Sequence, residues 1–177
     1  TAGEVRIDGM LPGPETKRIV SYLPERTYLS RWMRVTDAIE LFEDFYDDFR
    51  PERAEEMLRS LQIDPKKTLG TMSKGTLEKV QLILVMSRAA RLYLLDEPIG
   101  GVDPAARDYI LNTILSNYER GATILLSTHL IRDIERVLDD VVFIQNGQVV
   151  LASSVEAVHQ NYGKSVDELF REVFRCW

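Results

Sequence analysis

Residues 91–98, Arg91-Leu92-Tyr93-Leu94-Leu95-Asp96-Glu97-Pro98, are an apolar run that ends in two adjacent acids. A strand that is apolar on both faces is typical of the interior of a parallel sheet covered by helices. Open α/β sheets bind ligands at the carboxyl edge of their strands, and two acids placed there suit a divalent metal ion and a polarised water molecule. The stretch alone also allows a core strand that ends in a solvated Asp-Glu-Pro turn.

The composition is that of an ordinary globular domain. The chain has 177 residues, 45% of them hydrophobic and 28% charged, which is enough for one domain with a sizeable core. Its net charge of −6 argues against nucleic acid as a partner, because phosphate backbones are bound by clustered Lys and Arg. The single cysteine, Cys176, cannot form an internal disulfide and fits a reducing compartment. No apolar run approaches the ~20 residues that span a bilayer, so a role at a membrane would depend on a partner.

Three other stretches are predicted to be strands. Residues 4–8 alternate between apolar and polar side chains, and residues 18–23 form an apolar strand that a proline stops before Glu25. Residues 122–128 form another buried strand, and His129 stands at its carboxyl end. A polar group that could bind a ligand therefore follows more than one predicted strand.

A helical insertion separates these strands. Residues 26–66 are rich in helix formers, so we divide the chain into an α/β core of residues 1–25 and 67–177 and a helical subdomain of residues 26–66. A second helix of the subdomain is expected over residues 52–61. The first helix of the subdomain, which precedes residues 52–61, should have an aromatic core face and an acidic solvated face. The residues of that aromatic face are Leu41, Phe42, Phe45, Tyr46 and Phe49.

Capping residues mark the helices of the core. Ser73 should cap one helix, and Asp103 another that begins at Pro104, runs to about residue 120 and stops at Gly121. A short helix is expected over residues 130–138.

A hairpin and a capped helix are expected near the carboxyl terminus. The pair Asn146-Gly147 predicts a hairpin turn, and Ser165 with Glu168 forms a capping box before a last helix. That helix should pack on the domain through its apolar side, although a dimer contact is the alternative. His159 is interpreted as a surface or satellite-core residue.

Groups that could bind ligands gather at one predicted edge of the sheet. Glu25, the pair Asp96–Glu97 and His129 each follow a predicted parallel strand directly, and such strand ends lie along one edge. Ser73-Lys74-Gly75 adds a helix start, where free N–H groups and partial positive charge favour an anion. The alternative for that segment is a plain capped helix after a loop.

These residues carry a family resemblance that covers essentially the whole chain. Met72-Ser73-Lys74-Gly75-Thr76 resembles the signature motif of ATP-binding cassette (ABC) ATPases, and its distance to residues 92–97 resembles their signature-to-Walker B spacing. Gly100-Gly101-Val102-Asp103 resembles the D-loop, Ser127-Thr128-His129 the switch histidine, and Tyr22-Leu23-Pro24-Glu25 the Q-loop. The resemblance implies a P-loop NTPase-like fold, with a parallel sheet flanked by helices and a RecA-like core.

The resemblance implies a role for each motif, with ATP and Mg²⁺ as cofactors. Asp96 would hold Mg²⁺, Glu97 would orient or deprotonate the attacking water, and His129 would contact the γ-phosphate. Glu25 would sit near the metal and link the site to a partner. Four residues would act across a dimer interface, with Asp103 crossing it and the signature residues binding the opposite subunit's ATP. The signature residues are Ser73, Lys74 and Gly75.

The sequence departs from the family pattern in one large way and several small ones. It contains no Gly-x-x-x-x-Gly-Lys-Ser/Thr phosphate loop, so we expect a fold that lacks the N-terminal Walker A βα unit. The strand at residues 123–127 would then have a bare edge, and these residues alone should be inactive. Glu25 stands where many members have Gln. Lys74 replaces the commonest Gly of the signature and resembles bacterial exporter-type ATPases.

The partner implied by the resemblance is a separate transmembrane permease subunit. A second ATPase subunit would complete a homo- or heterodimer, located in the cytoplasm on the inner face of the plasma membrane. Four residues after the Q-loop would receive a short helix of the permease, close the core of the helical subdomain, or do both: Tyr28, Leu29, Trp32 and Met33. The alternative functions are a soluble ABC ATPase outside transport and a non-catalytic truncated cassette that docks or regulates.

Overall fold

The computed structural model describes residues 3–100 and 104–174. They form two compact units, which divide between Thr128 and His129 and are described separately below.

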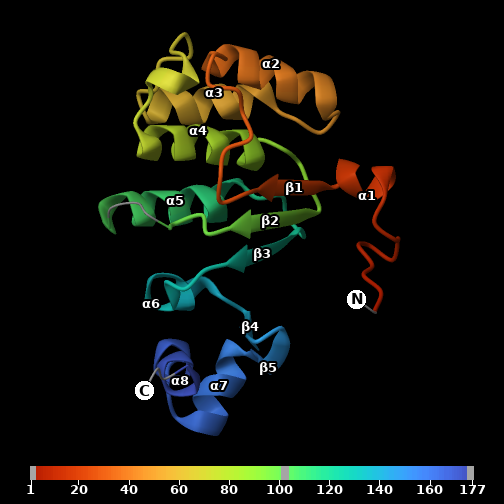
Figure 1. Ribbon diagram of the computed structural model, residues 1–177, viewed down its shortest axis with the longest axis vertical. Coiled ribbons are helices and arrows are strands. Elements are labelled where there is room, and N and C mark those ends of the chain that lie inside the picture. Colours follow the sequence, from red (N-terminus) through yellow and green to blue (C-terminus); the bar gives the residue numbers. More distant parts are fainter. Residues whose placement is uncertain (1–2, 101–103, 175–177) are drawn as a thin grey trace. The chain divides into compact units, whose positions relative to one another are not determined.

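The first unit is built on a three-stranded parallel sheet (Figure 1). Its strands are β1 (Val20–Leu23), β2 (Leu92–Asp96) and β3 (Thr123–Ser127), and β2 lies in the middle. In the register, Leu23 pairs with Leu95 and Asp96 pairs with Ser127. Residues 92–96 are therefore a strand in the interior of a parallel sheet, as predicted.

Helices connect the strands. They are α1 (Pro14–Arg18), α2 (Val35–Phe45), α3 (Pro51–Ser60), the 3₁₀ turn η1 (Leu69–Thr71), α4 (Lys74–Met86) and α5 (Pro104–Asn117). Figure 1 shows α2 and α3 lying beside α4, which in turn packs against β1 and α5. α4 is apolar over its second half and is buried there on all sides, as expected for a helix between a sheet and other helices.

One face of the sheet is covered by these helices. The side chain of Ser21 points to α4, where its Oγ donates a hydrogen bond to the Val85 carbonyl at 2.9 Å. Tyr93 and Leu95 lie on the same face as Ser21 and are fully buried. The core of the first unit lies between this face and α4.

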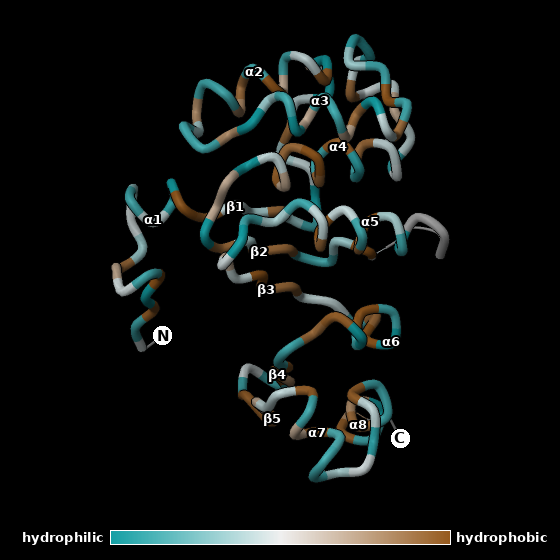
Figure 2. The backbone as a smooth tube through the Cα atoms, turned by 180° about the vertical axis from the view of Figure 1, so that it is seen from behind, coloured by the Kyte–Doolittle hydropathy of each residue, from teal (hydrophilic) through white to brown (hydrophobic). Residues whose placement is uncertain are grey.

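The opposite face of the sheet is much more exposed. Tyr22, Leu94 and Leu125 form a row across the three strands, and Tyr22 is 50% and Leu125 61% exposed. Figure 2 shows that β2 and β3 are nevertheless hydrophobic along their length. β2 is thus more deeply buried on the face that α4 covers than on this face among the described residues.

The second unit has a small core of its own. It contains α6 (Ile131–Ile134), the 3₁₀ turn η2 (Glu135–Val137), β4 (Asp140–Gln145), β5 (Gln148–Ser154), α7 (Val155–Tyr162) and α8 (Val166–Val173). Asn146 and Gly147 both have positive φ, at 51° and 77°, which confirms the predicted hairpin turn. The capping box of Ser165 and Glu168 at the start of α8 is also confirmed. Phe143 packs edge-on against Phe170 and Phe174 in this core.

Several local predictions need correction. Residues 4–8 form no strand, and only a single bridge joins Ile7 to Met10. Phe45 was expected in the aromatic core face, but α2 ends there and the side chain is 73% exposed. α5 ends at Asn117, before the predicted residue 120, and α1 and α7 were not predicted. The caps of α7, Ser154 at its start and left-handed Gly163 at its end, were readable in the sequence.

Candidate functional site

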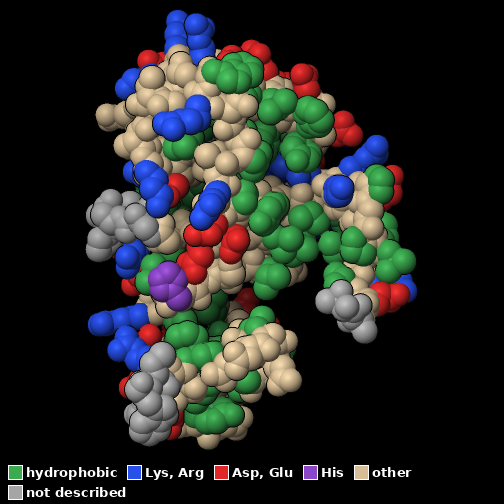
Figure 3. Space-filling view, in the orientation of Figure 1, with side chains coloured by type: hydrophobic (Ala, Val, Ile, Leu, Met, Phe, Trp, Pro, Cys, Tyr) green, Lys and Arg blue, Asp and Glu red, His purple; other side chains and the backbone are tan. Residues whose placement is uncertain are grey.

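The site forms where β2 and β3 end side by side. Ser127 Oγ donates a hydrogen bond to Asp96 Oδ1 at 2.5 Å, and Thr128 Oγ1 donates to Glu97 Oε2 at 3.1 Å. The backbone continues the ladder here, since the Glu97 N–H donates to the Ser127 carbonyl at 3.0 Å. Both carboxylates are half-buried. Two acids at the end of β2 are thus paired with two hydroxyls at the end of β3. Acidic side chains gather in the middle of the first unit in Figure 3.

The backbone at Glu97 is in an unusual conformation. Its φ of 48° lies in the left-handed region, which costs a non-glycine residue about 1–2 kcal/mol. A turn fixes this conformation, because the Gly100 N–H donates to the Glu97 carbonyl at 3.0 Å and Ile99 is completely buried. Such strain is found most often at functional sites, where it is retained because it orients a side chain.

Glu25 lies at the same edge of the sheet but is exposed. It follows β1, whose last residue, Leu23, pairs with Leu95 of β2. Among the described residues, no three acidic, histidine or cysteine side chains are grouped closely enough to hold a metal ion. Mg²⁺ in nucleotide sites is held by one or two carboxylates together with substrate phosphates. Asp96 and Glu25 provide one or two carboxylates at this edge, which fits a site of that kind. They are too few to form a metal site from protein ligands alone.

The start of α4 is a capped and accessible helix terminus. Ser73 Oγ accepts a hydrogen bond from the Thr76 N–H at 3.2 Å, so the predicted cap is confirmed. The Lys74 side chain is 79% exposed and lies 3.7 Å from Glu78 one turn later. A Cβ added at Gly75 would meet nothing within 4 Å, so the backbone there is open to approach. These bonds lie within α4, and the opposite-subunit role of these residues stays a prediction.

Two predicted site residues are not among the described residues of the first unit. Asp103 falls outside the described residues. His129 is exposed and begins the second unit, directly after Thr128 in the chain. The predicted gathering of His129 with Asp96 and Glu97 therefore stays a prediction.

The predicted partner surface divides into two pairs. Leu29 and Met33 are buried in the first unit at 6% and 8% exposure, as expected for a closed core. Tyr28 and Trp32 are 55% and 76% exposed. Leu29 and Met33 therefore close the core as one hypothesis expected, whereas a role of Tyr28 and Trp32 in receiving a permease helix stays a prediction.

Tyr28 also lines a cavity of about 220 Å³, together with Lys17, Tyr22 and Tyr46. Desolvation of its hydroxyl and the neighbouring Tyr46 raise the pKa of Tyr28 to about 12, against the opposing charge of Arg88. This hydroxyl is therefore neutral over the physiological pH range.

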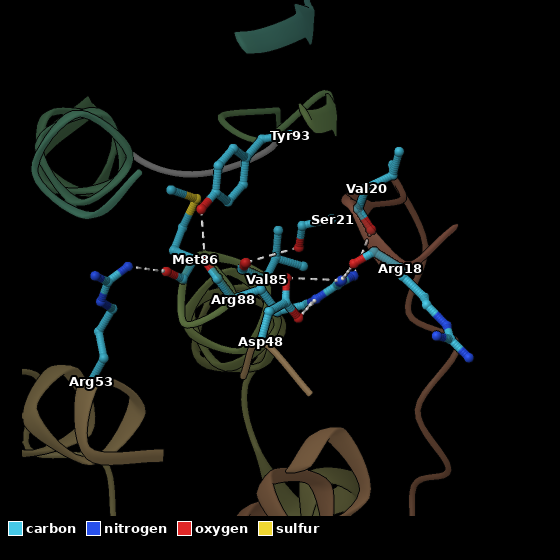
Figure 4. Close-up of polar contacts among 9 residues, drawn as sticks. All are labelled: Arg18, Val20, Ser21, Asp48, Arg53, Val85, Met86, Arg88 and Tyr93. Carbon is cyan, nitrogen blue, oxygen red and sulfur yellow. Dashed lines mark hydrogen bonds and ion pairs between the residues drawn. The ribbon is translucent and has the colours of Figure 1, made fainter. Parts of the chain in front are cut away.

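A buried arginine that was not predicted from the sequence joins the helical insertion to β1. Arg88 is 1% exposed and donates to both carboxylate oxygens of Asp48, at 2.8 and 3.1 Å (Figure 4). It also donates to the carbonyls of Arg18 and Val20, each at 2.5 Å, and its guanidinium lies 3.8 Å from the Tyr46 ring. No local sequence signal marks this arginine, because its partners are 40 to 70 residues away along the chain.

The chain is similar to an AAA-domain family model and to ABC transporter ATP-binding proteins. A family model described as "AAA domain, putative AbiEii toxin, Type IV TA system" matches residues 22–131. An uncharacterized ABC transporter ATP-binding protein of Methanocaldococcus jannaschii is 31% identical over 144 residues, which are 78% of this chain and 55% of that protein. The ABC transporter ATP-binding protein YtrB of Bacillus subtilis is 27% identical over 92% of this chain and 57% of its own length.

A solved structure, an ATP-binding subunit of an ABC transporter, superposes with a TM-score of 0.87 at 29% identity. It is matched over 98% of this chain and 77% of that chain. The fold is thus that of a P-loop NTPase-like α/β domain with a parallel sheet flanked by helices. The chain belongs to the AAA-domain family that this model describes, and the curated relatives and the solved structure it resembles are ABC transporter ATP-binding proteins. It spans about half the length of the curated relatives it matches.

Proposed function

We propose that this chain contributes the water-activating half of an ATPase site in the ATP-binding subunit of an ABC transporter. The observation that carries this proposal is the pair Asp96–Glu97, which ends a central parallel strand and is half-buried at the carboxyl edge of the sheet. The relatives support it, since they are named as ABC transporter ATP-binding proteins.

The residues then have the following roles. Asp96 would hold Mg²⁺, partly through water, with Glu25 as a further candidate ligand, and Glu97 would orient or deprotonate the attacking water. Bound Mg²⁺ neutralises the charge of the phosphates, and phosphoryl transfer otherwise needs mostly positioning. His129 contacts the γ-phosphate. Across the dimer interface, the opposite subunit's ATP is bound by Ser73, Lys74, Gly75 and Asp103.

The test is Glu97→Gln in a form of the protein that turns over Mg-ATP. A general base contributes about 10²–10⁴ in rate, so turnover should fall at least about a hundredfold while ATP still binds. Glu43→Gln is the matched control, because Glu43 is an exposed residue of α2. Full turnover in Glu97→Gln would reject Glu97 as the catalytic carboxylate.

The 177 residues alone should bind ATP poorly and should not hydrolyse it. They contain no phosphate loop of the Gly-x-x-x-x-Gly-Lys-Ser/Thr type, whose Lys and hydroxyl contact the phosphates and Mg²⁺. One face of the sheet has an exposed apolar row of Tyr22, Leu94 and Leu125, and β3 is paired on one side only among the described residues. Both features are consistent with a further βα unit that packs against this sheet. Measurable Mg-ATP turnover by these residues would overturn this part of the proposal.

The subunit would act as a dimer and power a separate transmembrane permease, with export favoured by Lys74 in the signature. No helix in the described part of the chain is long and apolar enough to cross a bilayer. We place the protein in the cytoplasm, on the inner face of the membrane, with residues 26–66 as the helical subdomain that meets the permease.

Exposed Trp32 is the test residue for this docking. Trp32→Ala should reduce co-purification with the permease while thermal unfolding stays unchanged. Tyr162→Ala, at a 48%-exposed aromatic of α7, is the control. Unchanged assembly in Trp32→Ala would count against the docking surface.

The absent phosphate loop also favours one second candidate, a non-catalytic cassette that only docks or regulates. The two candidates separate on Mg-ATP turnover by the longest natural form of the protein. Turnover supports the enzyme, and its absence in a folded, permease-bound subunit supports the docking protein.

A further inference from the structure

The two hydroxyls at the end of β3 have no role in the function proposed so far. Asp96 pairs with Ser127 in the register of the sheet, and the N–H of Glu97 continues that ladder to the Ser127 carbonyl at 3.0 Å. This ladder brings the next residue, Thr128, level with Glu97, where its hydroxyl meets Glu97 Oε2 at 3.1 Å. The contact is thus set by strand pairing as well as by side-chain rotation.

The bond has a fixed direction and a rigid donor. An ionised carboxylate can only accept, so the Thr128 hydroxyl donates, and hydrogen bonds to charged acceptors are about twice as strong as neutral ones. The β-branched side chain of Thr has few χ1 choices in a strand-like backbone. Thr128 therefore restrains one oxygen of Glu97 against a stiff point at the end of the sheet.

The backbone of Glu97 fixes only the start of its side chain. Its backbone is held in the left-handed region by the turn to Gly100, which sets the direction of the Cα–Cβ bond. A glutamate side chain still has further rotatable bonds beyond Cβ. The turn fixes the base of this side chain and Thr128 restrains its end.

We propose that Thr128 is a positioning residue for the ATPase reaction, which holds the Glu97 carboxylate in place for the attacking water. This inference rests on the proposed role of Glu97. It assigns Thr128 a function separate from that of His129, the next residue, and separate from that of Ser127, which contacts Asp96.

The experiment measures steady-state Mg-ATP hydrolysis by the longest natural form of the protein with Thr128→Val, Thr128→Ser and the control Thr123→Val. Valine keeps the shape of threonine and removes the hydroxyl. We expect Thr128→Val to lower kcat about tenfold with KM for ATP within about twofold, because misplacing a reacting group slows chemistry more than it weakens binding. Thr128→Ser should restore kcat to within about twofold. Thr123→Val, at the opposite end of β3 and exposed, should leave both constants unchanged.

A double-mutant cycle separates this inference from the proposed function. If Glu97→Gln keeps a measurable residual rate, and Thr128→Val lowers kcat of the wild type but lowers this residual rate no further, the two residues act together as proposed. If Glu97→Gln is inactive but Thr128→Val alone has wild-type kcat, the role of Thr128 is overturned and that of Glu97 stands. If Glu97→Gln keeps full turnover, both are overturned. A crystal structure of the 177 residues with Thr128→Val gives a readout free of turnover, in which an unmoved Glu97 carboxylate would also overturn the inference.

Discussion

β2 and β3 are neighbouring strands with similar sequences and very different surroundings. Leu92-Tyr93-Leu94-Leu95-Asp96 and Thr123-Ile124-Leu125-Leu126-Ser127 are both apolar runs that end in a polar residue. β2 has a strand on each side, whereas β3 pairs only with β2 among the described residues. The faces of the sheet differ as well, since Leu95 on the covered face is 2% exposed and Leu125 on the opposite face is 61% exposed. The apolar pattern of a strand therefore indicates where it can lie, while its burial is decided by what else packs against it.

The largest expected effect concerns the other neighbour of β2. β1 is held on its outer side by Arg88, which bonds the Arg18 and Val20 carbonyls and Asp48. Arg88→Met should lower the free energy of unfolding by about 3–5 kcal/mol, because it leaves a carboxylate and two carbonyls without their partner. Urea denaturation of this variant and of Arg59→Met, whose side chain is 70% exposed, measures the difference. Equal stability of the two variants would show that the contacts of Arg88 with β1 and Asp48 do not stabilise the fold.

The contrast between the covered face of the sheet at Leu95 and its open face at Leu125 should be nearly as large. Leu95→Ala removes a fully buried side chain and should cost about 2–5 kcal/mol. Leu125→Ala changes an exposed side chain and should stay within about 0.5 kcal/mol. Both are read from urea midpoints at equal m-values. A cost above about 2 kcal/mol for Leu125→Ala would mean that the outer face of β3 is covered in solution, for instance by a second copy of the chain.

What could be predicted from the sequence was local. The Ser73 cap, the Asn146-Gly147 turn and the Ser165 capping box involve residues within a few positions of each other, and all three are confirmed. The parallel strands and the place of Asp96–Glu97 at the sheet edge were also predictable, because apolar runs and connecting helices leave few arrangements.

The remainder depends on contacts between distant segments. Thr128 reaches Glu97 from 31 residues away, and Arg88 reaches Asp48 from 40. Neither contact has a periodicity that a single sequence displays. The exposure of Phe45 likewise follows from where α2 ends and could not be read from the aromatic spacing.

A smaller effect is expected at the point where β2 ends and the chain turns. Glu97 has a φ of 48°, and glycine adopts this conformation without steric cost. Glu97→Gly should therefore be about 1 kcal/mol more stable than Glu97→Ala, since both lack the carboxylate and only alanine keeps the strained Cβ. Thermal unfolding of the two variants measures this difference. If alanine is as stable as glycine, the left-handed conformation carries no strain, and the turn to Gly100 does not constrain Glu97.

The smallest expected effect is a dependence of folding stability on alkaline pH, which arises from β2 and not from β3. Tyr93 of β2 pairs with Ile124 of β3, so only β2 has an ionisable group at this level of the sheet. Burial raises the pKa of Tyr93 above its usual 10, partly offset by hydrogen bonds, and its hydroxyl donates to the Arg88 carbonyl at 2.6 Å. A raised folded-state pKa means that the stabilisation is complete below about pH 10 and is lost as the pH rises through the folded pKa.

At neutral pH, Tyr93→Phe should therefore be about 1 kcal/mol less stable than the wild type, because it lacks the hydrogen bond. Between pH 10 and 11 its free energy of unfolding should fall less than that of the wild type. Tyr28, whose pKa is raised to about 12, contributes in the same direction and remains in both proteins, so the slope should decrease without vanishing. Urea titrations at several pH values measure it, with Tyr162→Phe as the control on an exposed tyrosine. An alkaline slope that is identical in Tyr93→Phe and the wild type would show that the hydroxyl of β2 ionises as readily in the folded as in the unfolded chain.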